Sequence, residues 1–203
     1  MVPLKASDAA TVDAVADAMR DGAVALVPTD TVYGLACDPR RPAAARRIYA
    51  LKSRPAELRL PVIVHGVDQA RSLRVDWNGA ADRLAAAFWP GALTIAVGAG
   101  APGVEWLADR DEIAIRAPAD PLIASIAERL GPFLMTSANP HGQGTAPTFE
   151  AVVNSLGGAP DVAVDGGARS VTASTVVNVN LPDPRIEREG AIPAADVERV
   201  LDE

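Results

Sequence analysis

The sequence predicts a layered α/β domain built on a mixed β-sheet. Short runs rich in Val, Ile and Leu alternate with longer segments of helical periodicity, which is the pattern of an α/β fold. The last three strand-like runs follow one another with no helix between them, which indicates antiparallel pairing there and so a sheet of mixed direction. Polar clusters follow six of the apolar runs, and we expect them to converge on one rim of the sheet.

The strand candidates are short segments in which β-branched and other apolar residues dominate. They are residues 23–27, 61–64, 93–97, 112–116, 133–136, 161–164, 174–179 and 185–188.

The helix candidates fill the intervals between these strands. They are residues 8–20, 42–51, 79–88, 120–130, 148–156 and 193–201. In the first of them Val12, Val15 and Met19 share one face. Asp120 and Pro121 are a typical N-cap and first helical residue.

Length and composition indicate one domain over residues 1–203. A chain of 203 residues with 49% apolar content can bury a sizeable core without a second domain. The single Cys37 excludes an internal disulfide framework, and only two histidines, His65 and His141, argue against a metal site made by the protein alone. Cys37 is expected to be a small buried apolar residue.

Charge and hydropathy restrict the partners and the compartment. The first eight residues lack a signal-peptide pattern, and no apolar run approaches the roughly 18 residues of a membrane span, so we expect a cytoplasmic protein without a membrane partner. The net charge of −7 argues against a surface that coats nucleic acid, although a local basic cleft is compatible with it.

The most informative segment is Pro28-Thr29-Asp30-Thr31-Val32-Tyr33-Gly34-Leu35, which follows the first central strand. Its hydroxyls and carboxylate lie where the backbone leaves the sheet, as expected of a loop that grips a polar ligand. A turn stabilised by Asx or Thr side chains explains the same residues without a ligand.

Cationic residues follow the second helix candidate. Lys52 and Arg54 are two residues apart beside Pro55, with Arg59 shortly after, so they can clamp phosphate oxygens. They can equally complement the dipole at a helix C-terminus. His65 ends the next strand, where it can serve a ligand or bond to the backbone.

Further polar residues follow later strands. Arg116 ends a strand and can pair with a substrate carboxylate or with Asp120. Ser137 and Asn139, and then Thr145 in a glycine-rich loop, offer hydroxyl and amide groups, although turn chemistry explains them equally well. Asp165-Gly166-Gly167, Ser174-Thr175 and Arg188 complete the set.

Common nucleotide-binding and hydrolytic motifs do not occur in the sequence. It contains no P-loop, no Gly-x-Gly-x-x-Gly after the first strand, no Gly-x-Ser-x-Gly and no His-Glu-x-x-His. Any nucleotide must therefore be held by side-chain cations and scattered loops.

Nine motifs, taken in order, resemble those of the YrdC-like threonylcarbamoyl-AMP synthase family. Besides the segment at residues 28–35, they are Lys52-Ser53-Arg54-Pro55, Pro61-Val62-Ile63-Val64-His65, Phe88-Trp89-Pro90-Gly91, Ala114-Ile115-Arg116-Ala117-Pro118, Ser137-Ala138-Asn139, Asp165-Gly166-Gly167, Ser174-Thr175-Val176-Val177 and Arg188-Glu189-Gly190-Ala191-Ile192. The likeness extends over nearly the whole chain, in the short form without an additional C-terminal domain.

The resemblance implies a twisted mixed sheet with flanking helices around a concave basic cavity. It also implies condensation of L-threonine, bicarbonate and ATP to threonylcarbamoyl-AMP and pyrophosphate, for the threonylcarbamoyladenosine modification of tRNA. By matching position, threonine would be held by Thr31, His65, Arg116, Ser137 and Ser174. ATP would be held by Lys52, Arg54, Asn139, Thr145 and Arg188. Mg²⁺ would arrive with ATP, and a downstream transferase complex would receive the adenylate.

Some residues depart from the family pattern, and other functions are also compatible with the sequence. Glu189 places an anion beside Arg188, and Ser53 occupies a slot often held by glycine or asparagine. The same domain occurs in larger carbamoyl-transfer enzymes that carry further modules. A structured-RNA-binding module without catalysis is the main alternative, and direct tRNA binding is compatible with either reading. The sequence names no general base.

Overall fold

The fold is a strongly mixed α/β arrangement around a single continuous sheet. A computed structural model describes residues 2–8 and 10–202. The strands are β1 (Leu4–Lys5), β2 (Ala25–Val27), β3 (Gly34–Cys37), β4 (Val62–Ile63), β5 (Leu93–Gly98), β6 (Glu112–Arg116), β7 (Phe133–Ser137), β8 (Val162–Asp165), β9 (Thr175–Asn178) and β10 (Arg185–Arg188). The helices are α1 (Thr11–Arg20), α2 (Pro42–Lys52), α3 (Val67–Ser72), α4 (Gly79–Phe88), α5 (Pro121–Leu130), α6 (Phe149–Ser155) and α7 (Ala194–Leu201), with a 3₁₀ turn η1 (Glu105–Leu107).

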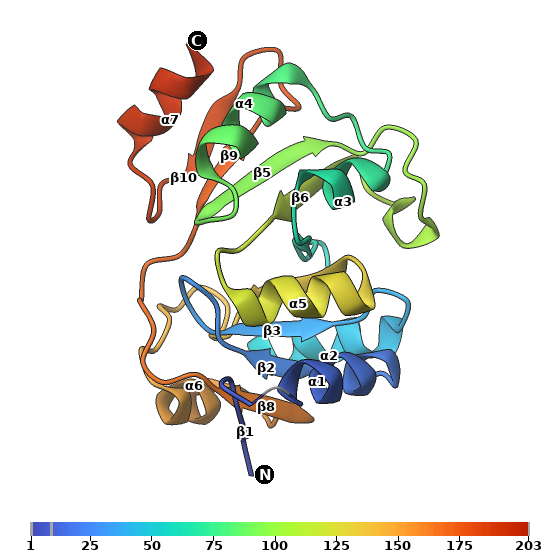
Figure 1. Ribbon diagram of the computed structural model, residues 1–203, viewed down its shortest axis with the longest axis vertical. Helices are drawn as coiled ribbons and strands as arrows, with labels where there is room; N and C mark the ends of the chain where they lie inside the picture. Colours follow the sequence, from blue (N-terminus) through green and yellow to red (C-terminus); the bar gives the residue numbers. More distant parts are fainter. Residues whose placement is uncertain (1, 9, 203) are drawn as a thin grey trace.

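The ten strands form a sheet with the order β1-β8-β2-β3-β7-β4-β6-β5-β9-β10. Strand β3 runs antiparallel to both β2 and β7, whereas β4 and β6 are parallel, as are β5 and β9. In Figure 1 the sheet divides into two groups of elements, one around β2, β3 and β8 and the other around β5, β9 and β10. The short strand β4 pairs with β7 on one side and β6 on the other, so it joins the two groups.

Helices cover the sheet because successive strand residues point to opposite faces. Ala25 and Val27 of β2 pack with apolar residues of α1 and α5, which lie side by side in Figure 1. Val24 and Leu26 belong to the larger core on the other face, with residues of α2, α4 and α7. Within the described residues, no helix combines the length and apolar character that a membrane-spanning helix requires.

The eight predicted strands all occur, with ends that differ by two residues or fewer. The predicted helices occur as well; the first begins at Thr11 rather than at Asp8, because residues 6 and 7 form a turn and the Thr11 hydroxyl donates to Lys5 O (2.7 Å). Residue 9 of that predicted helix lies outside the described residues. Cys37 is fully buried at the end of β3, as predicted.

The predicted pairing of the last three strands is partly wrong. β9 and β10 are antiparallel, but β8 pairs in parallel with β1 and β2 at the other end of the sheet. Residues 166–174 therefore cross from one group of strands to the other, which is visible at the side of Figure 1. This crossover has no local sequence signal, and it brings Ser174 to the site described next.

Candidate functional site

A cavity of about 260 Å³ lies where the two groups of strands meet. Its charged lining consists of Arg54, Arg59, Arg116 and Arg188, and its polar lining consists of Thr29, Tyr33, Thr94, Thr136, Ser137 and Ser174. Among the described residues no carboxylate lines the cavity. In a chain of net charge −7, this segregation of four guanidiniums indicates an anionic ligand.

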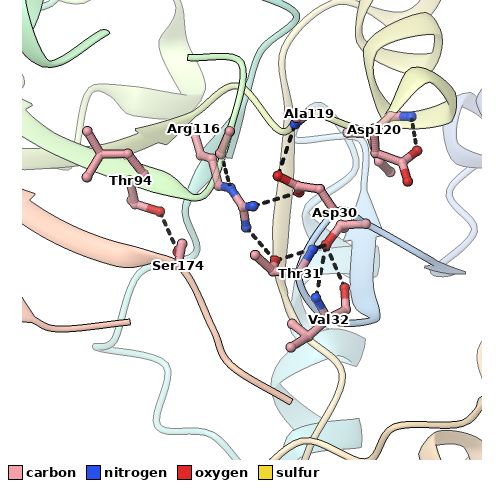
Figure 2. Close-up of polar contacts among 12 residues, drawn as sticks. Asp30, Thr31, Val32, Thr94, Arg116, Ala119, Asp120 and Ser174 are labelled. Atoms are coloured by element: carbon pink, nitrogen blue, oxygen red, sulfur yellow. Dashed lines mark hydrogen bonds and ion pairs between the residues drawn. The ribbon is translucent and has the colours of Figure 1, made fainter. Parts of the chain in front are cut away.

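Arg116, the last residue of β6, is the most buried of these arginines. Its Nε donates to Gly91 O (3.0 Å), its Nη1 to Thr31 Oγ1 (2.9 Å) and its Nη2 to Asp30 Oδ1 (2.6 Å), as Figure 2 shows for the last two contacts. Burial lowers the pKa of Arg116, and the negative charge of Asp30 opposes that shift. Three of the five N–H donors are engaged, which leaves one on each terminal nitrogen for a bidentate carboxylate.

The ion pair of Arg116 corrects one alternative from the sequence. Its partner is Asp30 and not Asp120, because Asp120 caps α5 and accepts from the backbone N–H groups of Leu122 and Ile123. Asp30 also accepts from the Ala119 N–H (3.1 Å), on the loop between β6 and α5.

Ser174, directly before β9, lines the cavity wall on the side of β5 and β9. Its hydroxyl lies 2.9 Å from that of Thr94 on β5, and Arg188 Nη2 donates to Ser174 O (2.8 Å) and to its hydroxyl (3.2 Å). Arg188 ends β10 after a register irregularity in the β9–β10 pair, a feature that commonly redirects a side chain. Burial, followed by the positive charge of Arg54, lowers the pKa of Arg188, and both arginines line the cavity.

Gly190 allows the Arg188 segment to pack against this wall. A Cβ at residue 190 would overlap Ala173 O and lie 2.6 Å from Ser174 O, and both are backbone atoms that cannot rotate away. We expect Gly190→Ala to lower the free energy of unfolding by about 1–3 kcal/mol, as overpacking generally does. Urea denaturation measures this change. Gly144→Ala, which meets nothing within 4 Å, is the matched control, and equal stability of the two variants would contradict the prediction.

Arg54 follows the C-terminus of α2 and lines the cavity from a third side. The helix ends at Lys52, and its C-cap Ser53 has a left-handed φ of 50°, a conformation that glycine and asparagine adopt most readily. Arg54 Nε and Nη2 donate to the carbonyls of Leu58 and Arg59. Neither Arg54, Arg59 nor Arg188 forms an ion pair within the described residues, so their charges are available to a ligand.

Lys52 lies behind the cavity wall and holds the end of β7. Its side chain is buried, and Nζ donates to Ser137 O (2.5 Å), Asn139 O (2.5 Å) and Asn139 Oδ1 (3.2 Å). The Asn139 amide donates in turn to the carbonyls of Pro140 and Gln143. Lys52 and Asn139 therefore shape the turn that presents Ser137 to the cavity.

Burial, followed by the positive charge of Arg54, lowers the pKa of Lys52 from 10.5 to about 8. Between these values the unfolded chain binds the proton that the folded protein has lost, so the Lys52 contribution to stability rises with pH. We expect the free energy of unfolding of the wild type, minus that of Lys52→Met, to increase by about 1 kcal/mol per pH unit from pH 8 to 10.5.

Denaturant titrations at several pH values measure this difference. Burial raises the pKa of Cys37 to about 12, so the Cys37 contribution to stability falls as the pH rises above 9. This contribution is the same in the wild type and in Lys52→Met, and it cancels in the difference between them. A difference that does not change with pH would contradict the prediction.

The ten predicted site residues fall into three groups. Arg54, Arg116, Ser137, Ser174 and Arg188 line the cavity. Thr31, Lys52 and Asn139 contact those lining residues from behind. His65 and Thr145 are not among the described residues that line it: His65 is exposed, although the preceding Val64 N–H bonds to Arg116 O (3.0 Å), and Thr145 donates to Val171 O (3.0 Å) on the crossover.

Some cavity residues were not predicted as site residues. The sequence indicates Arg59 only as a cation near Lys52 and Arg54, and it does not single out Thr94, although a threonine between Leu93 and Ile95 in an apolar strand is a detectable signal. Tyr33 also lines the cavity, and its hydroxyl bonds to Gly166 N and Gly167 O, which anchors the crossover to β3. Glu189 accepts from the Ala194 N–H at the start of α7 (3.0 Å), and no ion pair joins it to Arg188 among the described residues.

The sequence and the fold both match one family of known proteins. The Sua5/YciO/YrdC family profile, described as "Telomere recombination", matches residues 17–190. A Mycobacterium leprae protein is 32% identical over 187 residues, which cover 91% of this chain and 84% of that protein. The threonylcarbamoyl-AMP synthase of Bacillus subtilis is 32% identical over 189 residues, covering 90% of this chain and 54% of the relative.

A solved structure agrees with these sequence matches. The crystal structure of Pyrococcus abyssi Sua5 complexed with L-threonine superposes with a TM-score of 0.84 at 28% identity, covering 93% of this chain. The chain spans 56% of that protein, so it corresponds to about half of the longer relatives. The matched region includes every residue that lines the cavity. The chain therefore belongs to the Sua5/YciO/YrdC family.

Proposed function

We propose that the protein is an L-threonylcarbamoyladenylate synthase, which condenses L-threonine, bicarbonate and ATP to threonylcarbamoyl-AMP and pyrophosphate. The observation that carries this proposal is the cavity with four arginines and no carboxylate among its described lining residues. Relatives named threonylcarbamoyl-AMP synthase, and a relative solved with L-threonine, support the choice of substrates.

The reaction needs positioning and charge neutralisation more than a covalent nucleophile. The threonine amine attacks bicarbonate with loss of water to give a carbamate, and a carbamate oxygen then attacks the α-phosphate while pyrophosphate leaves. Both steps bring anions together, so fixed cations that hold them in register lower the barrier. No imidazole or carboxylate lines the cavity in the described part of the chain, and we propose that substrate oxygens accept the amine proton.

The arginines divide between the two substrates by their surroundings. Arg116 has one free donor on each terminal nitrogen and is the proposed partner of the threonine carboxylate, with the hydroxyls of Ser137 and Ser174 nearby. Arg54 and Arg188 have no carboxylate partner among the described residues and are the proposed ligands of the triphosphate, with Arg59 beside them. Lys52, Asn139 and Thr31 support these groups from behind. His65 and Thr145 keep their predicted binding roles only if ligand binding moves them toward the cavity.

Mg²⁺ is proposed to arrive with ATP. No cluster of three or more histidine, cysteine or acidic side chains able to hold a metal occurs among the described residues, and the only oxygen atoms on the described side chains that line the cavity are hydroxyls. This donor set suits an ion whose ligands are mainly phosphate oxygens and waters. The ion would then neutralise charge on the phosphates that the arginines do not reach.

Delivery of the adenylate to a transferase for tRNA modification, in the cytoplasm, completes the proposal. Pyrophosphate release from Mg²⁺-ATP, with threonine and bicarbonate each supplied or omitted, tests the reaction when mass spectrometry detects the adenylate in parallel. Release that requires both substrates is the expected result. Release that requires neither, or no release at all, would contradict it, and salt-sensitive RNA binding in that case would favour the RNA-binding alternative.

A further inference from the structure

Asp30 is the one acidic residue whose carboxylate contacts a cavity arginine within the described part of the chain. Its Oδ1 accepts from Arg116 Nη2 (2.6 Å) and its Oδ2 accepts from the Ala119 N–H (3.1 Å). Figure 2 shows the carboxylate between the guanidinium and the Ala119 backbone. Both oxygens are therefore fixed before any ligand arrives.

Asp30 lies beside the cavity rather than in its wall. Arg116 lines the cavity, whereas neither Asp30 nor Thr31 belongs to its described lining, and the side chains of Asp30 and Arg116 are 14% and 8% exposed. A carboxylate in this position does not occupy the cavity face of the guanidinium. It is placed to hold Arg116, not to compete with a ligand for it.

The pair joins three segments that are remote in the sequence. Asp30 lies on the turn between β2 and β3, Arg116 ends β6, and Ala119 follows it on the loop to α5. Thr31 and Gly91 O bind the remaining engaged donors of Arg116. An arginine side chain has several rotatable bonds, and these contacts remove that freedom before binding, which lowers the entropic cost of binding a ligand.

We propose that Asp30 is a positioning residue, which fixes the Arg116 guanidinium so that its two free N–H donors face the carboxylate of an α-amino acid in the cavity. This inference rests on the proposed function. It assigns Asp30 a role in the affinity for the amino acid, and none in the affinity for ATP. The contribution comes from the charge of Asp30 and from its two acceptor oxygens, since an amide is neutral and has only one acceptor oxygen.

Asp30→Asn tests this role because asparagine has nearly the same shape and can still accept one hydrogen bond. We expect the variant to bind L-threonine at least tenfold more weakly by calorimetry, with ATP affinity unchanged within twofold. In the pyrophosphate-release assay, the factor by which the KM for threonine rises should exceed the factor by which kcat falls. If Asp30 had a purely structural role, the substitution would weaken the binding of threonine and of ATP together.

Asp120→Asn is the matched control. It removes the same charge from a neighbouring residue that does not contact Arg116, and asparagine is an equally good N-cap. This variant should bind threonine as the wild type does. Asp30→Glu retains the carboxylate and should restore threonine affinity to within threefold of the wild type.

Three results would overturn the inference. They are threonine binding by Asp30→Asn at wild-type strength or tighter, an equal loss of threonine and ATP binding in a folded Asp30→Asn variant, or threonine binding by Asp30→Glu as weak as that of Asp30→Asn. If Asp30→Asn does not fold, Asp30→Glu is compared with the wild type instead, and a loss of threonine affinity greater than threefold would overturn the inference. Failure of the wild type itself to bind threonine would overturn the proposed function, which is a separate outcome from any difference between variants.

Discussion

Arg116→Ala should lower the affinity for L-threonine by roughly 30-fold to more than 1,000-fold. Truncating one member of a buried, hydrogen-bonded charge pair costs about 2–5 kcal/mol of binding, and each 1.4 kcal/mol is tenfold. The variant loses the fork proposed for the substrate carboxylate, and it also leaves Asp30 without its charge partner. The threonine requirement of adenylate formation should therefore rise far more than the ATP requirement.

Steady-state assays that vary threonine and ATP separately measure this effect. Arg129→Ala on α5 removes the same charge from an exposed position and should behave as the wild type. Arg116→Lys keeps a positive charge without the planar fork and should recover only part of the affinity. Equal increases in the requirement for both substrates would contradict the proposed carboxylate contact.

Arg54→Ala should reduce adenylate formation by about 10²–10³-fold, with ATP as the affected substrate. Removing one charge-stabilising donor from a site where charge develops has an effect of this size. Arg54 lines the cavity without a carboxylate partner among the described residues, and its positive charge contributes to lowering the pKa of Arg188, which lines the same cavity. Its loss removes positive charge from the place where pyrophosphate is proposed to leave.

The control for Arg54 comes from α2, the helix that precedes it. Arg46→Ala removes an exposed arginine of α2 that does not line the cavity, and its activity should remain at the wild-type level. Arg54 also bonds to the carbonyls of Leu58 and Arg59, so Arg54→Lys shows whether charge alone restores activity when these bonds are lost. Unchanged activity in Arg54→Ala would remove Arg54 from the phosphate-binding set.

The sequence predicted the strands whose apolar composition is strong and missed those that depend on pairing. β3 consists of Gly34-Leu35-Ala36-Cys37, which has no β-branched residue, and it was interpreted as the end of a polar loop. It becomes a strand because β2 and β7 pair with it on either side. β1, with only two residues, and the short helix α3 were missed because so few residues carry little periodicity.

The candidate site was also predicted only in part, as the fold was. Polar residues at strand ends were correctly expected to meet at one place, and Arg116, Ser137 and Arg188 do so. The sequence could not show that the Lys52 ammonium is directed to the carbonyls of Ser137 and Asn139, since that contact depends on the antiparallel placement of β7 beside β4. Nor did the sequence identify Asp30 as the partner of Arg116: it offered Asp120, which caps α5, whereas the Asp30 contact joins residues that are 86 positions apart.

The crossover at residues 166–174 has a consequence for the newly made chain. Thr29 and Arg54 come from the first third of the sequence, whereas Ser174 and Arg188 reach the cavity only after the chain has returned from β8 to the far side of the sheet. During synthesis, a ribosome-bound chain that has not yet released residue 188 lacks one wall of the cavity. The nascent protein should therefore acquire its ligand affinity in a single late step, after most of the polypeptide has already left the exit tunnel.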